Sequence, residues 1–297
     1  MHRDVAPRPR VLRFAPVFSS RMVLQQAPAR SALFGDLIVD TSSASPPSNV
    51  RVHITVRPVH KGRRETRRPY SVEASLEAPV KRVKRKRFPT YTVPDGLWTW
   101  RAYLHPMPAG GDWIIRATAN TSETHLHADL HVVTFGDVWM CAGQSNMEHE
   151  LKRTFGHPKT VKAAASGSLD NIRLLPTVQR DSHLPLEFAE WTTARQAARL
   201  TPNYAAKNAY GTWLSPTTLG HAAARRSAST APRVAASATS GSDWRLSEPA
   251  LNAFCSVCWY FAVALTERFV AHGRPAPSLG LVCAASGGAS SAPGPRS

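Results

Sequence analysis

The sequence contains few cysteines and no long apolar segment. Four cysteines in 297 residues, Cys141, Cys255, Cys258 and Cys283, are too few to predict the disulfide framework of a small secreted protein. No run of about 18 apolar residues occurs, so no membrane span is predicted. Residues 1–18 carry prolines and charges where a secretory signal needs an apolar centre, so no signal peptide is predicted either.

Acidic residues are also scarce, and the excess of positive charge is concentrated near the N-terminus. The chain has 20 Asp and Glu against 37 Lys and Arg, a formal net charge of +17. The run KRVKRKR, from Lys81 to Arg87, is almost entirely basic and could bind a polyanion. A solvated basic insertion between strands, at about residues 57–88, is the interpretation we expect, and polyanion binding is the alternative. The motifs of RNA-binding modules and zinc fingers are missing, which disfavours nucleic acid as the partner.

Cys255 and Cys258 form a Cys-x-x-Cys motif. No second cysteine pair and no paired histidines complete the ligand set of a structural zinc. The motif lies inside an apolar helical pattern, in which buried thiols are common. We therefore expect buried structural thiols here, with a redox or metal-binding role as the alternative.

The pattern of residues 11–133 indicates short β-strands. Segments such as VRVHITVRPV (residues 50–59) and DWIIRATAN (residues 112–120) alternate apolar with polar residues and are rich in β-branched and aromatic side chains. Pro, Gly, Asn or Ser separate several of these segments. Regular spacing without a helical period predicts an antiparallel β-sandwich domain over residues 1–133, interrupted by the basic insertion.

Three histidines near the end of this region, His125, His127 and His131, are candidates for a metal site. His125 and His127 face the same side of a strand, and Asp129 faces that side too. Imidazole groups gathered on one edge can bind a metal ion. The alternative is a polar outer face of the sandwich, and it is the one we expect. No metal or other cofactor is therefore predicted.

From residue 134 onward the pattern becomes that of an α/β domain. A buried strand at residues 134–143 is followed at once by a segment that can begin a helix. Further buried strands are predicted at residues 171–178 and 278–288, with a long helix at 248–273 before the last of them. The Ala-rich segment around residues 192–250 has no clear period and is predicted to be a flexible insertion.

Ser145 lies at the junction between the first of these strands and its helix. A strand-to-helix turn can lift a hydroxyl off the edge of the sheet and direct backbone N–H groups and the helix dipole at a developing oxyanion. Gly143 allows the backbone to turn tightly beside it. A nucleophilic serine is one interpretation. The other is that Ser145 or Asn146 only caps the helix.

The stretch FGDVWMCAGQSNMEHEL, residues 135–151, closely resembles the nucleophile block of the sialate O-acetylesterases, a family of SGNH-type carbohydrate esterases. That block typically reads Gly-Asp-Val-Trp and then, a few residues later, Gly-Gln-Ser-Asn-Met-Glu. Residues 14–35, 253–269 and 278–288 are similar to three more family segments, in the right order. Ten positions of the block match: Gly136, Asp137, Val138, Trp139, Gly143, Gln144, Ser145, Asn146, Met147 and Glu148.

The resemblance implies an SGNH-hydrolase-like α/β domain over residues 134–297 that removes O-acetyl esters from sialic acids or related sugars without a cofactor. Ser145 would attack the acetyl carbonyl, and its own N–H together with that of Gly287 or Gly288 would form the oxyanion hole. The family works in lysosomal or extracellular settings, whereas this N-terminus predicts no compartment.

The chain departs from the family pattern where the catalytic base is expected. The pattern has an Asp-x-x-His near its C-terminus, and no histidine after Ser145 follows an aspartate at that spacing. The last 14 residues, AASGGASSAPGPRS, contain neither a histidine nor an acidic residue. We therefore expect an incomplete, N-terminal portion of an esterase with little activity of its own. The alternative is a non-catalytic protein that binds carbohydrate or a polyanion.

Overall fold

The computed structural model describes residues 9–15, 17–39, 50–59, 68–77, 96–120, 125–176, 213–216 and 251–285. The basic run from Lys81 to Arg87 and the glycines Gly287 and Gly288 lie outside the described residues. Most of the Ala-rich segment around residues 192–250 lies outside them as well.

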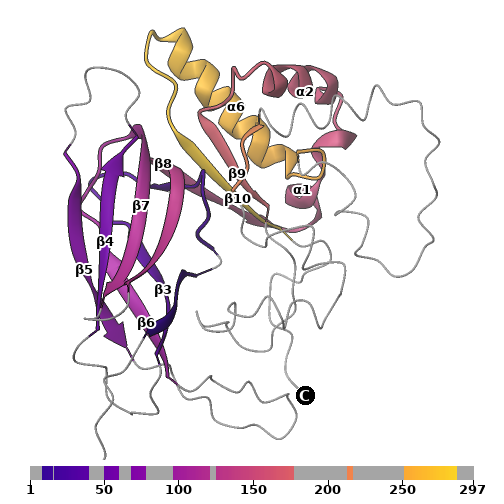
Figure 1. The fold of residues 1–297 in the computed structure, drawn as a ribbon. Coiled ribbons are helices and arrows are strands. Elements are labelled where there is room, and N and C mark those ends of the chain that lie inside the picture. Colours follow the sequence, from indigo (N-terminus) through magenta and orange to yellow (C-terminus); the bar gives the residue numbers. More distant parts are fainter. Residues whose placement is uncertain are drawn as a thin grey trace, which may run out of the picture.

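The described chain is mostly a mixed β-sheet with few helices (Figure 1). Along the sheet the order is β1-β3-β6-β5-β4-β7-β8-β10-β9, and β2 pairs with β8 beside this path. The strands are β1 (Pro9–Phe14), β2 (Val23–Gln25), β3 (Ala32–Val39), β4 (Arg51–Pro58), β5 (Tyr70–Glu77), β6 (Leu97–Tyr103), β7 (Gly110–Asn120), β8 (His125–Gly143), β9 (Ile172–Pro176) and β10 (Leu279–Ala285). β5 lies inside the stretch of residues 57–88 that the sequence analysis treats as a basic insertion.

Apart from β2, which pairs parallel with β8, the strands from β1 to the first part of β8 pair antiparallel and enclose the larger core. Their side chains alternate as the sequence pattern predicts: in β4, Val52, Ile54 and Val56 are fully buried, while the residues between them are not. Trp100 and Trp113 are also fully buried in this core. The expected division into a closed β-sandwich followed by an SGNH domain stays a prediction.

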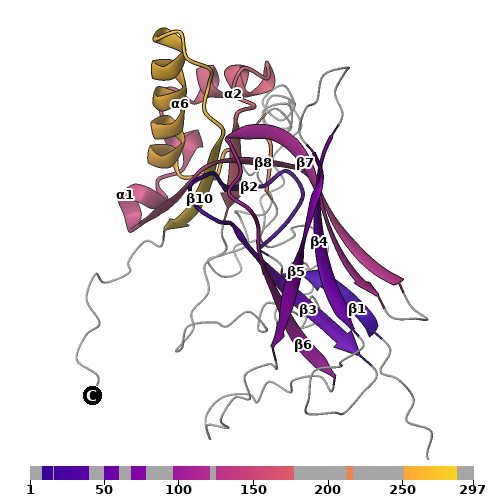
Figure 2. The same ribbon diagram turned by 90° about the vertical axis from the view of Figure 1, so that its left-hand side faces the viewer.

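β8 is one strand of 19 residues that crosses the predicted domain boundary between residues 133 and 134. Its first part pairs antiparallel with β7, and its last part pairs parallel with β10, which in turn pairs parallel with β9. Figures 1 and 2 show the helices gathered at this end of the molecule, away from β3 and β6. β8 therefore connects the antiparallel region to the α/β region without a linker.

The helices in the described residues are α1 (Ser145–Glu148), the 3₁₀ turn η1 (Leu151–Arg153), α2 (His157–Ala165) and α6 (Ser256–Ala271). α2 and α6 pack against β9 and β10 and form a second core, centred on Trp259, Phe254 and Leu281. No helix among the described residues is long and apolar enough to cross a membrane.

The histidines of β8 do not form a metal site. His125, His127 and His131 are exposed, and the described residues contain no group of three or more potential metal ligands placed to hold an ion. The Asp129 carboxylate instead accepts two hydrogen bonds of 2.7 Å from the Arg116 guanidinium on β7. These hydrogen bonds lower the pKa of Asp129 below its usual value.

This ion pair gives the fold a pH dependence of known sign. A carboxyl whose pKa is lower in the folded state stabilises the fold above its unfolded-state pKa, and this contribution is lost as the pH falls through the folded value. We expect Asp129→Asn to lower the urea midpoint modestly at pH 7, because the pair is partly exposed. The difference from the unmodified protein should shrink in increasingly acidic buffer. A difference that stays constant with pH would contradict this assignment.

Candidate active site

The predicted strand-turn-helix junction is present at Ser145. β8 ends at Gly143, and α1 begins at Ser145 after the single residue Gln144. A side chain at Gly143 would place its Cβ 2.8 Å from the Cβ of Met147, so only glycine allows the chain to turn this tightly. We call residues 143–145 the Ser145 corner.

Ser145 does not act as the helix cap. The cap position is occupied by Gln144, which makes no capping hydrogen bond with its side chain, and Ser145 is the first residue of the helix. Ser145 is exposed. Ser145 therefore lies at the surface at the N-terminal end of a short helix, whose first N–H groups have no partner within the helix.

β10 ends at the same edge of the sheet as β8. β10 runs parallel to β8, with Cys283 beside Cys141 and Ala285 beside Gly143. Parallel strands end at the same edge, so Ala285, the last residue of β10, lies beside the Ser145 corner. Gly287 and Gly288 follow two and three residues later, outside the described residues, and their predicted place in the oxyanion hole stays a prediction.

The four cysteines form two disulfide bonds, so the prediction of buried free thiols is wrong. Cys141 of β8 is bonded to Cys258 of α6, and Cys283 of β10 is bonded to Cys255 at the start of α6. Their Cα–Cα distances are 5.9 and 6.0 Å. Each bond fixes one of the two parallel strands to the helix a few residues before the strand reaches the Ser145 corner. No cysteine of the chain is free.

Two glutamines that the sequence analysis did not single out hold β8 from its other side. The Gln26 side chain donates a 2.7 Å hydrogen bond to the Asp137 carboxylate, and the Gln26 N–H donates to the carbonyl of Gly136. The Gln25 side chain accepts a hydrogen bond from the N–H of Val138. These contacts tie the segment around residue 25 to the Gly-Asp-Val-Trp part of the nucleophile block, although more than 100 residues separate them.

No protein-family model matches the chain, but comparisons with known proteins find similar sequences. Over 68 residues, 23% of this chain and 12% of the relative, it is 38% identical to rat sialate O-acetylesterase. Over 172 residues, 58% of this chain and 27% of the relative, it is 26% identical to the human sialate O-acetylesterase. Over these segments the chain is similar to the sialate O-acetylesterases. It spans at most 27% of the length of the curated relatives it matches.

The fold is also similar to a solved structure. A carbohydrate acetylesterase from Xanthomonas citri matches with a TM-score of 0.50 and 18% identity, over 95% of this chain and 41% of that one. Since the sequence identity is low, this likeness concerns the fold alone.

No described histidine of the chain is bonded to Ser145. His149 follows α1 directly and is exposed. His157 pairs with the side chain of Asn252 at 2.8 Å, and His272 contacts the carbonyl of Arg268 at 2.7 Å. Within the part of the chain that the structure describes, the Ser145 hydroxyl therefore has no base in contact with it.

A buried carboxylate near the Ser145 corner is occupied by other partners. Glu150 is 4% exposed, and its Oε2 atom lies 3.0 Å from the Arg153 guanidinium and 3.4 Å from the Lys152 ammonium. Neither carboxylate oxygen has a hydrogen bond of good geometry, so charge attraction alone balances its burial. This carboxylate stabilises the turn after α1, and no hydrogen bond or ion pair joins it to Ser145.

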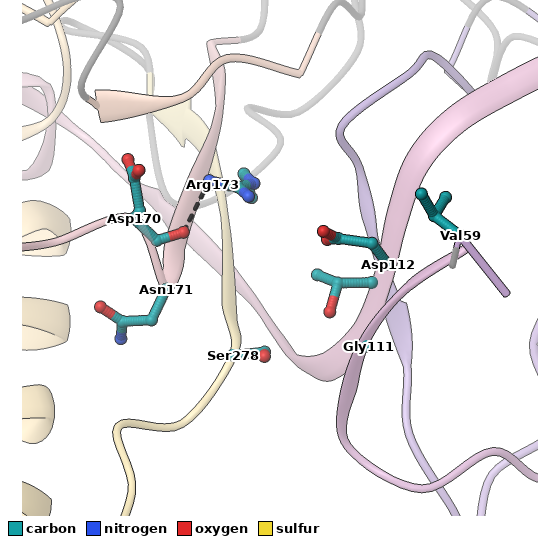
Figure 3. A pocket seen from close by; sticks show the side chains of 8 residues that line it. Val59, Gly111, Asp112, Asp170, Asn171, Arg173 and Ser278 are labelled. Atoms are coloured by element: carbon teal, nitrogen blue, oxygen red, sulfur yellow. Dashed lines mark hydrogen bonds between the residues drawn. The ribbon is translucent and has the colours of Figure 1, made fainter. Parts of the chain in front are cut away.

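A cavity of about 350 Å³ lies at the opposite end of the parallel strands (Figure 3). It is lined by Asp112, Asp170, Asn171, Arg173 and Ser278, among others. Arg173 donates a 2.6 Å hydrogen bond to the carbonyl of Asp170, and burial lowers the pKa of its guanidinium. Asn171 and Ser278 directly precede β9 and β10, so the cavity lies where these two strands begin. Ser145 follows the end of β8, which runs parallel to β10, and therefore lies at the other edge of the sheet. The cavity is therefore separate from the candidate active site.

Proposed function

We propose that the chain carries the nucleophile half of a carbohydrate O-acetylesterase, with Ser145 as the acyl acceptor and O-acetylated sialic acid or a related acetylated sugar as the substrate. The observation that supports this most is the position of Ser145, exposed at the first residue of a helix and beside the end of β10. The curated relatives, which carry the name sialate O-acetylesterase, supply the substrate class.

In the proposed reaction the Oγ atom of Ser145 attacks the acetyl carbonyl carbon and loses its proton to a base. The carbonyl oxygen becomes an oxyanion, which the N–H of Ser145 and that of Gly287 or Gly288 stabilise. Collapse of this intermediate releases the sugar hydroxyl and leaves acetyl-Ser145, which water then hydrolyses with help from the same base. The chain has no Asp-x-x-His, so both proton transfers lack their usual partner.

The missing base predicts a defined kinetic result. Loss of a triad base lowers the rate by several powers of ten, leaving what the oxyanion hole and substrate binding provide. We expect the purified chain and its Ser145→Ala variant to hydrolyse p-nitrophenyl acetate at the same background rate. Turnover well above background that depends on Ser145 would contradict the missing base.

A second measurement tests the nucleophile independently. Near neutral pH a reactive ester such as p-nitrophenyl acetate can acylate Ser145 slowly and release p-nitrophenol, and acetyl-Ser145 should accumulate because no base activates the water that would hydrolyse it. The protein is treated with p-nitrophenyl acetate, and its peptides are analysed by mass spectrometry. We expect an acetyl group on Ser145 before one appears on the exposed Ser166 and Ser168. Equal labelling of all three serines would remove the support for Ser145 as a nucleophile. The alternative function, binding of carbohydrate or a polyanion through the run from Lys81 to Arg87, stays a prediction.

A further inference from the structure

We propose that the cavity at the start of β9 and β10 binds a small zwitterion, an α-amino acid, whose carboxylate contacts Arg173 and whose ammonium contacts Asp112. At about 350 Å³, the cavity is near the lower end of the range of about 300–1,000 Å³ that ligand sites occupy. Asp112 of β7 and Val59 after β4 line one wall, and Arg173 of β9 and Ser278 before β10 line the other. This site is additional to the proposed catalytic site at Ser145 and does not depend on it.

The guanidinium of Arg173 has hydrogen-bond donors that the protein does not use. Its only hydrogen bond to a described residue is the 2.6 Å bond from Nη1 to the carbonyl of Asp170. The Nε atom is buried and has no partner among the described residues. Because a guanidinium donates from all of its nitrogens, the second hydrogen of Nη1 and both hydrogens of Nη2 are left for a ligand. A carboxylate is the group that accepts such donors with two parallel hydrogen bonds.

Asp112 provides the opposite charge on the opposite wall. Figure 3 shows its side chain pointing across the cavity toward β9 and Arg173, whereas the side chains of Asp170 and Asn171 point away from it. No ion pair or hydrogen bond joins Arg173 to a described side chain, so the charges of Arg173 and Asp112 face each other without contact. A molecule that carries one negative and one positive group can bridge them, and each of its ends then meets a charge of opposite sign.

Two hydroxyl groups on the walls also lack partners. Thr134 belongs to β8 and is only 7% exposed, yet its hydroxyl makes no hydrogen bond to a described residue. The hydroxyl of Ser278 makes none to a described residue either, although the carbonyl of Ser278 accepts a hydrogen bond from the N–H of Asp137. Polar groups inside a fold nearly always have a partner. Because Thr134 and Ser278 line the same cavity as Arg173, a carboxylate bound there can accept hydrogen bonds from their hydroxyls.

The charges around the cavity favour a ligand without net charge. Burial is the main cause of the lowered pKa of Arg173. Asp170 and Asp112 raise that pKa and Arg21 lowers it, so two carboxylates and two guanidiniums act on one another here. A simple anion would be repelled by the carboxylates and a simple cation by the guanidiniums, whereas a zwitterion is attracted at both ends. Among the described lining residues only Val59 has an apolar side chain, which favours an amino acid with a small polar side chain.

Binding can be tested with L-serine and with two molecules that each carry half of its charges. L-serine, 3-hydroxypropionate and ethanolamine are titrated separately into the full chain at neutral pH, and binding is followed by saturation-transfer NMR of the ligand protons. 3-Hydroxypropionate lacks the ammonium and ethanolamine lacks the carboxylate. We expect saturable binding of L-serine and an affinity about tenfold or more lower for each of the other two, because each loses the hydrogen bonds to one charged side chain.

Substitutions at the two charged groups test the orientation of the ligand. Arg173→Met should lower the affinity for L-serine by about tenfold or more, since the carboxylate loses its partner. Arg268→Met is the matched control, because Arg268 is exposed on α6 and does not line the cavity. Asp112→Asn should weaken the binding of L-serine but not that of 3-hydroxypropionate, which has no ammonium. Equal weakening of both molecules would overturn the assignment of Asp112 as the ammonium partner.

Thr134→Val keeps the test decisive if Arg173→Met does not fold. This substitution removes a hydroxyl that has no partner among the described residues, so the affinity for L-serine should fall without a loss in the free energy of unfolding. Absence of saturable L-serine binding would overturn the proposal, and so would tighter binding of D-glucose or of either half-charged molecule. Ser145→Ala should bind L-serine as tightly as the unmodified chain, so failure of this site and failure of the proposed esterase are distinguishable.

Discussion

Replacing Cys141 and Cys258 together with serine should lower the free energy of unfolding by about 2–5 kcal/mol, the usual cost of removing a native disulfide. The bond joins residues separated by 117 positions, so it removes a large amount of chain entropy from the unfolded state. It also fixes the end of β8 to α6 four residues before Ser145. Urea unfolding followed by tryptophan fluorescence measures the effect.

The second disulfide provides the matched control. Cys255 and Cys283 are separated by only 28 positions, and in the chain-entropy account their removal should cost about 1 kcal/mol less. A reducing agent should lower the stability of the unmodified protein toward that of a variant lacking both bonds. Four reactive thiols in the unreduced, unfolded protein would show instead that the cysteines are not paired.

The disulfide pairing of the four cysteines could not be predicted from the sequence, because it depends on the register of two strands that lie far apart in the chain. Cys141 and Cys283 are direct neighbours in the parallel pair of β8 and β10, so both can face α6. Cys255 and Cys258 are three residues apart and therefore lie on one side of the helix start. The helical pattern correctly predicted a buried side of α6, but a helical period contains no information on which strands that side meets.

Elements defined by local patterns were predicted well. The helix expected at residues 248–273 is α6, Ser256–Ala271, and the strands expected at residues 171–178 and 278–288 are β9 and β10 with shorter bounds. Short continuous apolar runs in these strands and three- to four-residue spacing along the helix are local properties. These local patterns match the folded structure because α6, β9 and β10 all bury side chains in the same core.

The nucleophile role of Ser145 was predicted from the resemblance of residues 135–151 to a family block more than from the physical properties of these residues. From the residues alone a capping serine was favoured over a nucleophile, although both need a strand followed by a helix. The structure decides the cap question because Gln144 takes the cap position. The contacts of Gln25 and Gln26 with β8 were missed, because side-chain hydrogen bonds between distant segments leave no periodic signal in a sequence.

Gly136→Ala should be among the most destabilising single substitutions in the chain. A Cβ at Gly136 would overlap the carbonyl oxygen of Ser278 and would lie 2.7 Å from the Ser278 Cβ. That carbonyl accepts the hydrogen bond from the N–H of Asp137 that starts the pairing of β8 with β10. The strands must separate to admit the methyl group, and we expect a loss of about 3 kcal/mol in the free energy of unfolding, at the upper end of overpacking costs.

Two controls separate the steric clash from other effects of replacing glycine. Gly110→Ala adds a methyl group into open space at a φ of +83°, so it should cost only the backbone strain, about 1–2 kcal/mol. Ser278→Gly removes the side chain but leaves the carbonyl, so it should not rescue Gly136→Ala. If the double variant with Gly136→Ala and Ser278→Gly regains full stability, the clash is with the Ser278 side chain. In that case Gly136 is not needed for the pairing of β8 with β10. If the double variant does not regain full stability, this glycine of the nucleophile block sets the register that brings the end of β10 to Ser145, a structural role that requires no contact with a substrate.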